Sequence, residues 1–243
     1  MNQSEFEILE NVALTSDVFK MILAGDTSAF QNPGQFLNIA LDGFYLRRPI
    51  SVCDRDENWL TILYKAVGTG TRFMSKLEAG NTLDILTGLG NGYHTHKSGA
   101  TPLLIGGGVG VPPLYGLAKQ LVAEGKTPTA VLGFHTKTEA FFINEFRAIC
   151  KDVIITTDDG SLGKQGFVTE GMKDCKPSYL YVCGPERMLK SVYDATDCDG
   201  EFSFEARMGC GFGACMGCSC ETKYGAKRIC KDGPVLERGE ILW

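Results

Sequence analysis

The chain has 243 residues, of which 44% are hydrophobic and 22% are charged, and its formal net charge at pH 7 is −5. This composition is that of a folded globular protein, and the negative charge gives no reason to expect a nucleic acid partner. No apolar run reaches the roughly 18 residues that a membrane-spanning helix needs, and the polar start at 1–5 lacks the pattern of a secretory signal. We therefore expect a cytoplasmic protein.

The first region, residues 1–98, has the pattern of an antiparallel β domain. Short apolar runs such as 36–41 and 60–64 are separated by turn-forming segments rich in Asn, Asp, Pro and Gly. This spacing is typical of a β-barrel or a β-sandwich.

Three motifs in this region suit a ligand that contains phosphate. In Arg47-Arg48-Pro49-Ile50-Ser51, the Arg48 guanidinium can pair with a phosphate, and Ser51 can hydrogen-bond a flavin or a phosphate. Gly68-Thr69-Gly70-Thr71 offers backbone N–H groups and hydroxyls, and Leu63-Tyr64-Lys65 could lie against an isoalloxazine or adenine edge. Each motif alone could also be a solvated charge or a tight turn. The order of the three motifs along the chain is what indicates a site for such a ligand.

From residue 99 the pattern changes to alternating strands and helices, which predicts a doubly wound α/β domain through about residue 200. Apolar runs predict strands at 102–105, 130–134, 153–156 and 179–183. Helices are expected after Pro112-Pro113 and around the aromatic stripe formed by Phe142, Phe146 and Ile149.

A glycine-rich turn joins the first of these strands to its helix, and it contains Gly106, Gly107, Gly108 and Gly110. Such a turn lets a pyrophosphate approach bare backbone at a helix N-terminus. Prolines stand where the third glycine of the dinucleotide fingerprint would be, and a simple tight connection is the alternative. Cys183-Gly184-Pro185 follows another strand. Because open α/β sheets bind ligands at the carboxyl edge, the two turns could line one crevice.

The last segment, 206–243, carries a C-x4-C-x2-C-x11-C pattern formed by Cys210, Cys215, Cys218 and Cys230. The first three cysteines have the spacing of plant-type [2Fe–2S] proteins, and the glycines between them let the backbone come close to a cluster. Structural zinc is the alternative, although zinc usually takes two close cysteine pairs and this segment has one. Cys220 competes with Cys218 for the third ligand position, and the x2 spacing favours Cys218.

Taken together, the Arg48–Ser51, Gly70-Thr71, Gly106–Pro113 and Cys183–Pro185 motifs with the terminal cysteines resemble the ferredoxin–NADP reductase superfamily. The segment Glu205–Cys218 with Cys230–Val235 is similar to the electron-transfer subunit of dihydroorotate dehydrogenase B. The resemblance implies an antiparallel FAD-binding β-barrel at 1–98, a Rossmann-like NAD-binding domain at 99–205 and a [2Fe–2S] module at 206–243.

The resemblance also implies roles for single residues. FAD would be held by Arg48, Pro49, Ile50, Ser51, Leu63, Tyr64, Lys65, Gly70 and Thr71; NAD by Gly106, Gly107, Gly108, Gly110, Gly184 and Pro185; and the cluster by Cys210, Cys215, Cys218 and Cys230. Cys183 would be a catalytic residue near the nicotinamide and the flavin, with a small buried strand-end residue as the equal alternative. NAD is expected over NADP because 135–139 contain Lys137 but no arginine to clamp a 2′-phosphate.

The implied partner is a separate FMN-containing catalytic subunit with a TIM-barrel fold that oxidises dihydroorotate in pyrimidine biosynthesis. Two copies of each subunit would form a heterotetramer, and electrons would pass from FMN through the cluster and FAD to NAD+. Similar subunits serve bifurcating NADH-dependent ferredoxin–NADP oxidoreductases, sulfide dehydrogenases and some hydrogenases, so these remain alternatives. A zinc-stabilised or redox-sensing module without catalysis is the third interpretation.

Overall fold

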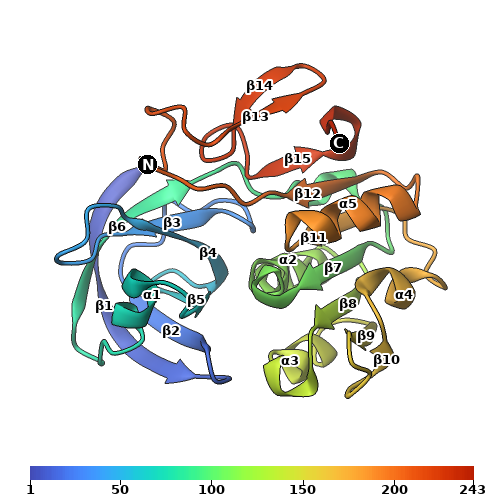
Figure 1. Cartoon of the computed structure of the whole chain (residues 1–243), viewed down its shortest axis with the longest axis horizontal. Coiled ribbons are helices and arrows are strands. Elements are labelled where there is room, and N and C mark those ends of the chain that lie inside the picture. Colours follow the sequence, from blue (N-terminus) through green and yellow to red (C-terminus); the bar gives the residue numbers. More distant parts are fainter.

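The computed structural model describes residues 1–243 and contains a closed β-barrel, a seven-stranded sheet and a two-stranded hairpin (Figure 1). The barrel strands are β1 (Asn2–Ala13), β2 (Val18–Ala24), β3 (Phe36–Ile39), β4 (Arg48–Arg55), β5 (Trp59–Lys65) and β6 (Thr82–Leu89). The sheet strands are β7 (Leu103–Gly107), β8 (Thr129–Phe134), β9 (Asp152–Thr157), β10 (Lys164–Gln165), β11 (Leu180–Cys183), β12 (Gly200–Ser203) and β15 (Val235–Glu237). The hairpin strands are β13 (Ser219–Thr222) and β14 (Gly225–Arg228).

Five α-helices complete the chain, one in the barrel and four around the sheet. They are α1 (Thr69–Met74), α2 (Pro112–Ala123), α3 (Ile143–Arg147), α4 (Val168–Met172) and α5 (Glu186–Ala195). None of them is long and apolar enough to cross a membrane.

The barrel closes in the order β1-β2-β5-β4-β3-β6, so the expected antiparallel barrel is confirmed. Side chains alternate between its two faces, as in any strand. On β3, Leu37 and Ile39 point into the barrel core, whereas Phe36 packs outside it in a second core. Strand β4, which begins with Arg48, lies between β5 and β3.

The sheet has the strand order β10-β9-β8-β7-β11-β12-β15, and every neighbouring pair is parallel except β12 with β15. From β7 the chain first builds towards β10 and then returns to the other side with β11. The direction of building therefore reverses between β7 and β11, and ligands of such sheets bind at the carboxyl ends of the strands at this point. The expected Rossmann-like α/β domain is confirmed.

One helix is shorter than the aromatic stripe predicts. Helix α3 begins only at Ile143, because Phe142 has a left-handed backbone with φ of 60° and stands outside the helix as its N-cap. Ile149 lies beyond the end of α3 at Arg147. The expectation that all three stripe residues are helical was therefore wrong, although Phe142 and Ile149 still pack against the core.

The C-terminal segment lies across the barrel and the sheet (Figure 1). Its Cys218, Ile229 and Cys230 share one buried core with Phe36 of the barrel and with sheet residues such as Val182. Strand β15 extends the sheet by pairing with β12. The segment is therefore held by contacts to both larger units.

Candidate functional site

The two adjacent arginines at the start of β4 have different surroundings. Arg47 pairs with Asp84 through two contacts of 3.1 and 2.8 Å and also donates to the carbonyl of Asn38. Arg48 has no carboxylate partner; its guanidinium lies over the Phe44 ring, 5.0 Å from the ring centroid. Arg48 is therefore the arginine whose charge is available for a phosphate.

The glycine–threonine motif lies directly against this arginine. A Cβ atom at Gly70 would overlap the Arg48 guanidinium, so the absent side chain is what lets helix α1 approach it. At the start of α1, the Gly68 N–H donates to Thr71 Oγ1 over 3.1 Å. The structure thus brings together two motifs that lie about twenty residues apart in the sequence, and the residues present fit a phosphate-containing cofactor such as FAD.

The three predicted residues of β5 point in different directions. Tyr64 lies in the barrel core and donates to Asn11 Oδ1 over 2.9 Å, and burial raises its pKa to about 12. Leu63 packs in the core between barrel and sheet. Lys65 reaches the cleft between them and pairs with Asp17 at 3.2 Å and Glu139 at 3.7 Å. The Tyr64 phenol is therefore turned into the barrel, whereas Lys65 lines the cleft.

A cleft of about 570 Å³ opens between the barrel and the carboxyl edge of the sheet. Its lining includes Gly107, Gly108, Val109, Gly133, Phe134, His135, Thr156, Asp158, Phe167, Pro185, Arg187, Met188 and Glu205. The glycine turn and the turn after β11 touch here, because a Cβ atom at Gly110 would overlap the Cys183 carbonyl oxygen. The two predicted turns therefore do line one crevice, as expected from the strand order.

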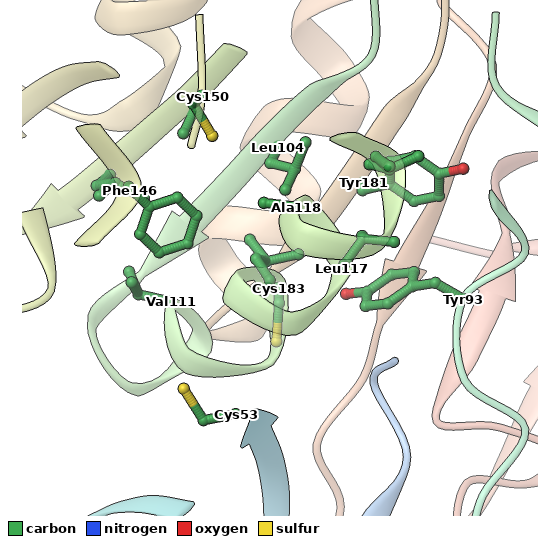
Figure 2. Close-up of a cluster of buried hydrophobic side chains, with 14 of the residues drawn as sticks. Cys53, Tyr93, Leu104, Val111, Leu117, Ala118, Phe146, Cys150, Tyr181 and Cys183 are labelled. Atoms are coloured by element: carbon green, nitrogen blue, oxygen red, sulfur yellow. The ribbon is translucent and has the colours of Figure 1, made fainter. Parts of the chain in front are cut away.

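Cys183 ends β11 in the core that joins the two units, and Figure 2 shows it with Cys53 of β4 among the same buried side chains. Burial, with a smaller contribution from Glu205, raises the pKa of Cys183 to about 12. The thiol is therefore neutral near pH 7 and unsuited to act as a thiolate nucleophile. Its side chain lies in the buried core and is not among the side chains that line the cleft.

Several cleft residues were missed by the sequence reasoning. Asp158 follows β9 and its carboxylate contacts His135 Nδ1 at 2.6 Å. Arg187 lines the same cleft, as does Glu205, whose pKa is raised by desolvation. A systematic search of the residues after each predicted strand would have found His135 and Asp158, because strand ends meet at one edge of the sheet.

The four spaced cysteines form two pairs. The backbone N–H of Cys215 lies beside Cys210 Sγ, and the backbone N–H of Cys230 lies beside Cys218 Sγ. Two thiol pairs suit a binuclear cluster that is held by four cysteines.

Backbone N–H groups point at these sulfurs. The N–H groups of Ala214 and Cys215 lie 3.2 and 3.4 Å from Cys210 Sγ, and the N–H of Cys230 lies 3.4 Å from Cys218 Sγ. Although desolvation acts in the other direction, the backbone donors lower the pKa of Cys210 to about 6. Such donors stabilise negative sulfur, so the loop fits an anionic iron–sulfur cluster.

Cys220 belongs to neither pair, although it packs against the same core as Cys218 and Cys230. It belongs to β13, where it is paired in register with Lys227 of β14. The structure therefore places Cys218, and not Cys220, beside Cys230.

A barrel with an arginine that has no acidic partner, a Rossmann-like sheet with its crevice, and a four-cysteine loop are the features of a flavin- and nicotinamide-dependent reductase of the ferredoxin–NADP reductase type. A profile described as the iron-sulfur cluster binding domain of dihydroorotate dehydrogenase B matches residues 205–242. A second profile, the oxidoreductase NAD-binding domain, matches residues 104–194. The expected cofactor set of FAD, [2Fe–2S] and NAD is therefore confirmed.

The particular family follows from full-length relatives. The dihydroorotate dehydrogenase B (NAD(+)) electron transfer subunit of Fusobacterium nucleatum is 42% identical, with 99% of each chain covered. The subunit of the same name from a Geobacillus species is 40% identical, with 100% of this chain and 99% of the relative covered. The chain belongs to the family of dihydroorotate dehydrogenase B electron transfer subunits.

Solved structures agree on the fold. An NADH-dependent reduced ferredoxin–NADP oxidoreductase matches 98% of this chain and 90% of its own, with a TM-score of 0.88 and 30% identity. Phthalate dioxygenase reductase matches 79% of this chain and 63% of its own chain, with a TM-score of 0.64 and 20% identity. The second likeness supports the fold alone.

Proposed function

We propose that this chain carries electrons between a separate FMN-containing subunit, which oxidises dihydroorotate, and NAD+, by way of the [2Fe–2S] cluster and FAD. A flavin can exchange a hydride with a nicotinamide and single electrons with a cluster, so it belongs between the two. The chain's own residues bind and orient these groups and exclude water from the crevice.

The observation that carries this proposal is the order of the barrel strands. Strand β4, with the flavin motif Arg48–Ser51, lies between β5 and β3. On one side, Lys65 of β5 lines the nicotinamide cleft. On the other side, Asn38 of β3 contacts the cysteine loop at Cys210. A flavin bound along β4 would therefore lie between a nicotinamide in the cleft and a cluster in the loop, which is the order that the electron path requires.

The residue roles follow from the same geometry. Arg48 with Gly70 and Thr71 would hold the FAD phosphates, Pro49, Ile50 and Ser51 would run along the flavin, and Gly106–Gly110 with Gly184 and Pro185 would hold the NAD pyrophosphate. Cys183 would contact the nicotinamide as a neutral thiol. Cys210 and Cys215 would hold one iron, and Cys218 and Cys230 the other. We propose the domain limits 1–98, 99–205 and 206–243, with β15 of the last module shared with the sheet.

Reconstitution with the partner tests the proposal. Adding dihydroorotate and NAD+ to this chain together with an FMN-containing dihydroorotate dehydrogenase subunit should produce NADH, and neither subunit alone should do so. The relatives' name implies such a catalytic partner, and a complex of two copies of each subunit is expected by mass measurement. NADH formation from dihydroorotate by this chain alone would contradict the proposed division of labour.

A second function has one observation in its favour, the match to the NADH-dependent reduced ferredoxin–NADP oxidoreductase at 30% identity. The relatives named as dihydroorotate dehydrogenase subunits are more similar, at 40% to 42%. The protein that co-purifies with this chain from its native cells separates the two functions.

A further inference from the structure

The cysteine loop meets the barrel at a buried polar side chain, that of Asn38. Asn38 is 1% exposed, and its Nδ2 donates a hydrogen bond to the carbonyl oxygen of Cys210 over 3.2 Å. The next residue, Gly211, has a φ of +79°, and a Cβ atom there would overlap Asn38 Nδ2. The loop backbone therefore approaches this side chain as closely as a glycine allows.

The other amide atom of Asn38 indicates why the residue is an asparagine. Its Oδ1 is buried and has no hydrogen-bond partner. An unpaired buried acceptor costs free energy, so an apolar residue of similar size would serve simple packing better. The amide is therefore explained by the hydrogen bond that it donates to Cys210.

The backbone of Asn38 is also fixed relative to the flavin motif. Strand β3 pairs with β4, with Asn38 opposite Pro49. The Asn38 carbonyl accepts a hydrogen bond of 3.3 Å from Arg47 Nη1, and Arg47 is itself paired with Asp84. Asn38 thus lies one strand away from the flavin motif and one hydrogen bond away from a cluster ligand.

We propose that Asn38 is a positioning residue that fixes the iron ligands Cys210 and Cys215 relative to β4, and thereby sets the rate of electron transfer between FAD and the cluster. The inference rests on the proposed function, since it needs both groups to be bound. The transfer moves one electron at a time and its rate falls steeply with separation. Misplacing a reacting group by about 1 Å can cost an enzyme as much as a hundredfold in rate.

Asn38→Leu tests this proposal, because leucine has a similar size and removes both amide atoms. In the purified full-length chain with its cofactors, NADH should reduce the flavin at a rate within about twofold of wild type, while the following reduction of the cluster slows about tenfold or more. The EPR spectrum of the reduced cluster should also change. Trypsin should cut after the exposed Arg207 about fivefold faster, as expected when a loop loses one hydrogen bond.

Thr27→Val is the matched control. Thr27 is also 1% exposed in the barrel, and its Oγ1 donates to the carbonyls of Asp56 and Glu57 over 2.6 and 2.9 Å. It makes no contact with the cysteine loop. This variant should lose stability in the same way but keep the wild-type rate of cluster reduction and the wild-type EPR spectrum.

The outcomes separate the inference from the proposed function. If NADH fails to reduce the cluster in the wild-type chain, the proposed function is wrong. If wild type behaves as expected and Asn38→Leu reduces its cluster at the wild-type rate with an unchanged spectrum, the role of Asn38 is wrong. Should Asn38→Leu not retain its cluster, Asn38→Ser, which keeps a shorter donor, should show an intermediate rate. A wild-type rate and spectrum in Asn38→Ser, with trypsin sensitivity unchanged, would then overturn the inference.

Discussion

Arg47 and Arg48 are neighbours in the sequence, yet only one of them is available to a ligand. Arg47 is held by Asp84 and by the Asn38 carbonyl, whereas Arg48 lies beside Gly70 without an acidic partner. A charged hydrogen bond contributes about 1.5–3 kcal/mol. We therefore expect Arg48→Ala to raise the Kd for FAD about 10- to 100-fold in a fluorescence titration of the flavin-free chain.

Arg47→Ala is the control for this titration. Its ion pair is partly exposed, and such pairs contribute about 0–1 kcal/mol to stability. This variant should lower the melting temperature slightly and leave the Kd for FAD within about threefold of wild type. The reverse pattern, with FAD lost only on removing Arg47, would contradict the assignment.

The five terminal cysteines give a second prediction at the scale of single residues. Cys218 lies beside Cys230, while Cys220 sits in the β13–β14 hairpin. Cys220→Ser should therefore retain iron and the EPR signal of the reduced cluster, whereas Cys210→Ser, Cys215→Ser, Cys218→Ser and Cys230→Ser should each lose most of both. A colourless Cys220→Ser protein beside an intact Cys218→Ser protein would show that the ligand is Cys220.

At the scale of elements, the crevice depends on contact between two turns. A side chain at Gly110 would overlap the backbone of Cys183, so the turn after β7 or the end of β11 would have to move. Gly110→Ala should weaken NADH binding about tenfold or more, because the pyrophosphate contacts depend on the position of this turn. Measured by titration with NADH, this loss should accompany a lower melting temperature.

Gly239→Ala provides the comparison for Gly110→Ala. Gly239 has open space around its Cα and no left-handed backbone. The variant should bind NADH like wild type. Equal affinities for all three proteins would show that the crevice between the two turns does not hold the nucleotide.

Much of this site could be predicted from local sequence. The glycine turn follows an apolar strand and precedes a proline-started helix, and the cysteine spacing reports the chemistry of one short loop. These patterns are local, so they can be recognised without knowing how the chain packs. The strand order then places the two turns at one edge of the sheet.

The features of the site and fold that the sequence did not predict depend mostly on contacts between residues far apart in the chain. Asn38 meets Cys210 across 172 positions of sequence, and no pattern around either residue indicates that contact. The direction of Tyr64 follows from the register of β5 within the closed barrel. The late start of α3 depends on one left-handed residue, Phe142, which periodicity alone does not predict.

At the scale of the whole molecule, the barrel places β4, which carries the proposed flavin motif, between the cleft and the cysteine loop. The C-terminal module shares its core with both larger units. The arrangement fits the proposed electron path across the barrel, from the exposed Cys215 end of the loop on one side to the cleft on the other.

The most direct test of this account is to purify the isolated chain anaerobically, measure its cofactors and then add NADH. The account predicts one FAD and two irons with two acid-labile sulfides per chain, as the four-cysteine loop implies. NADH should bleach the flavin and then the cluster, and an EPR signal of the reduced cluster should appear, while dihydroorotate should have no effect. Stoichiometric zinc with negligible iron, or a cluster that NADH cannot reduce, would contradict the account.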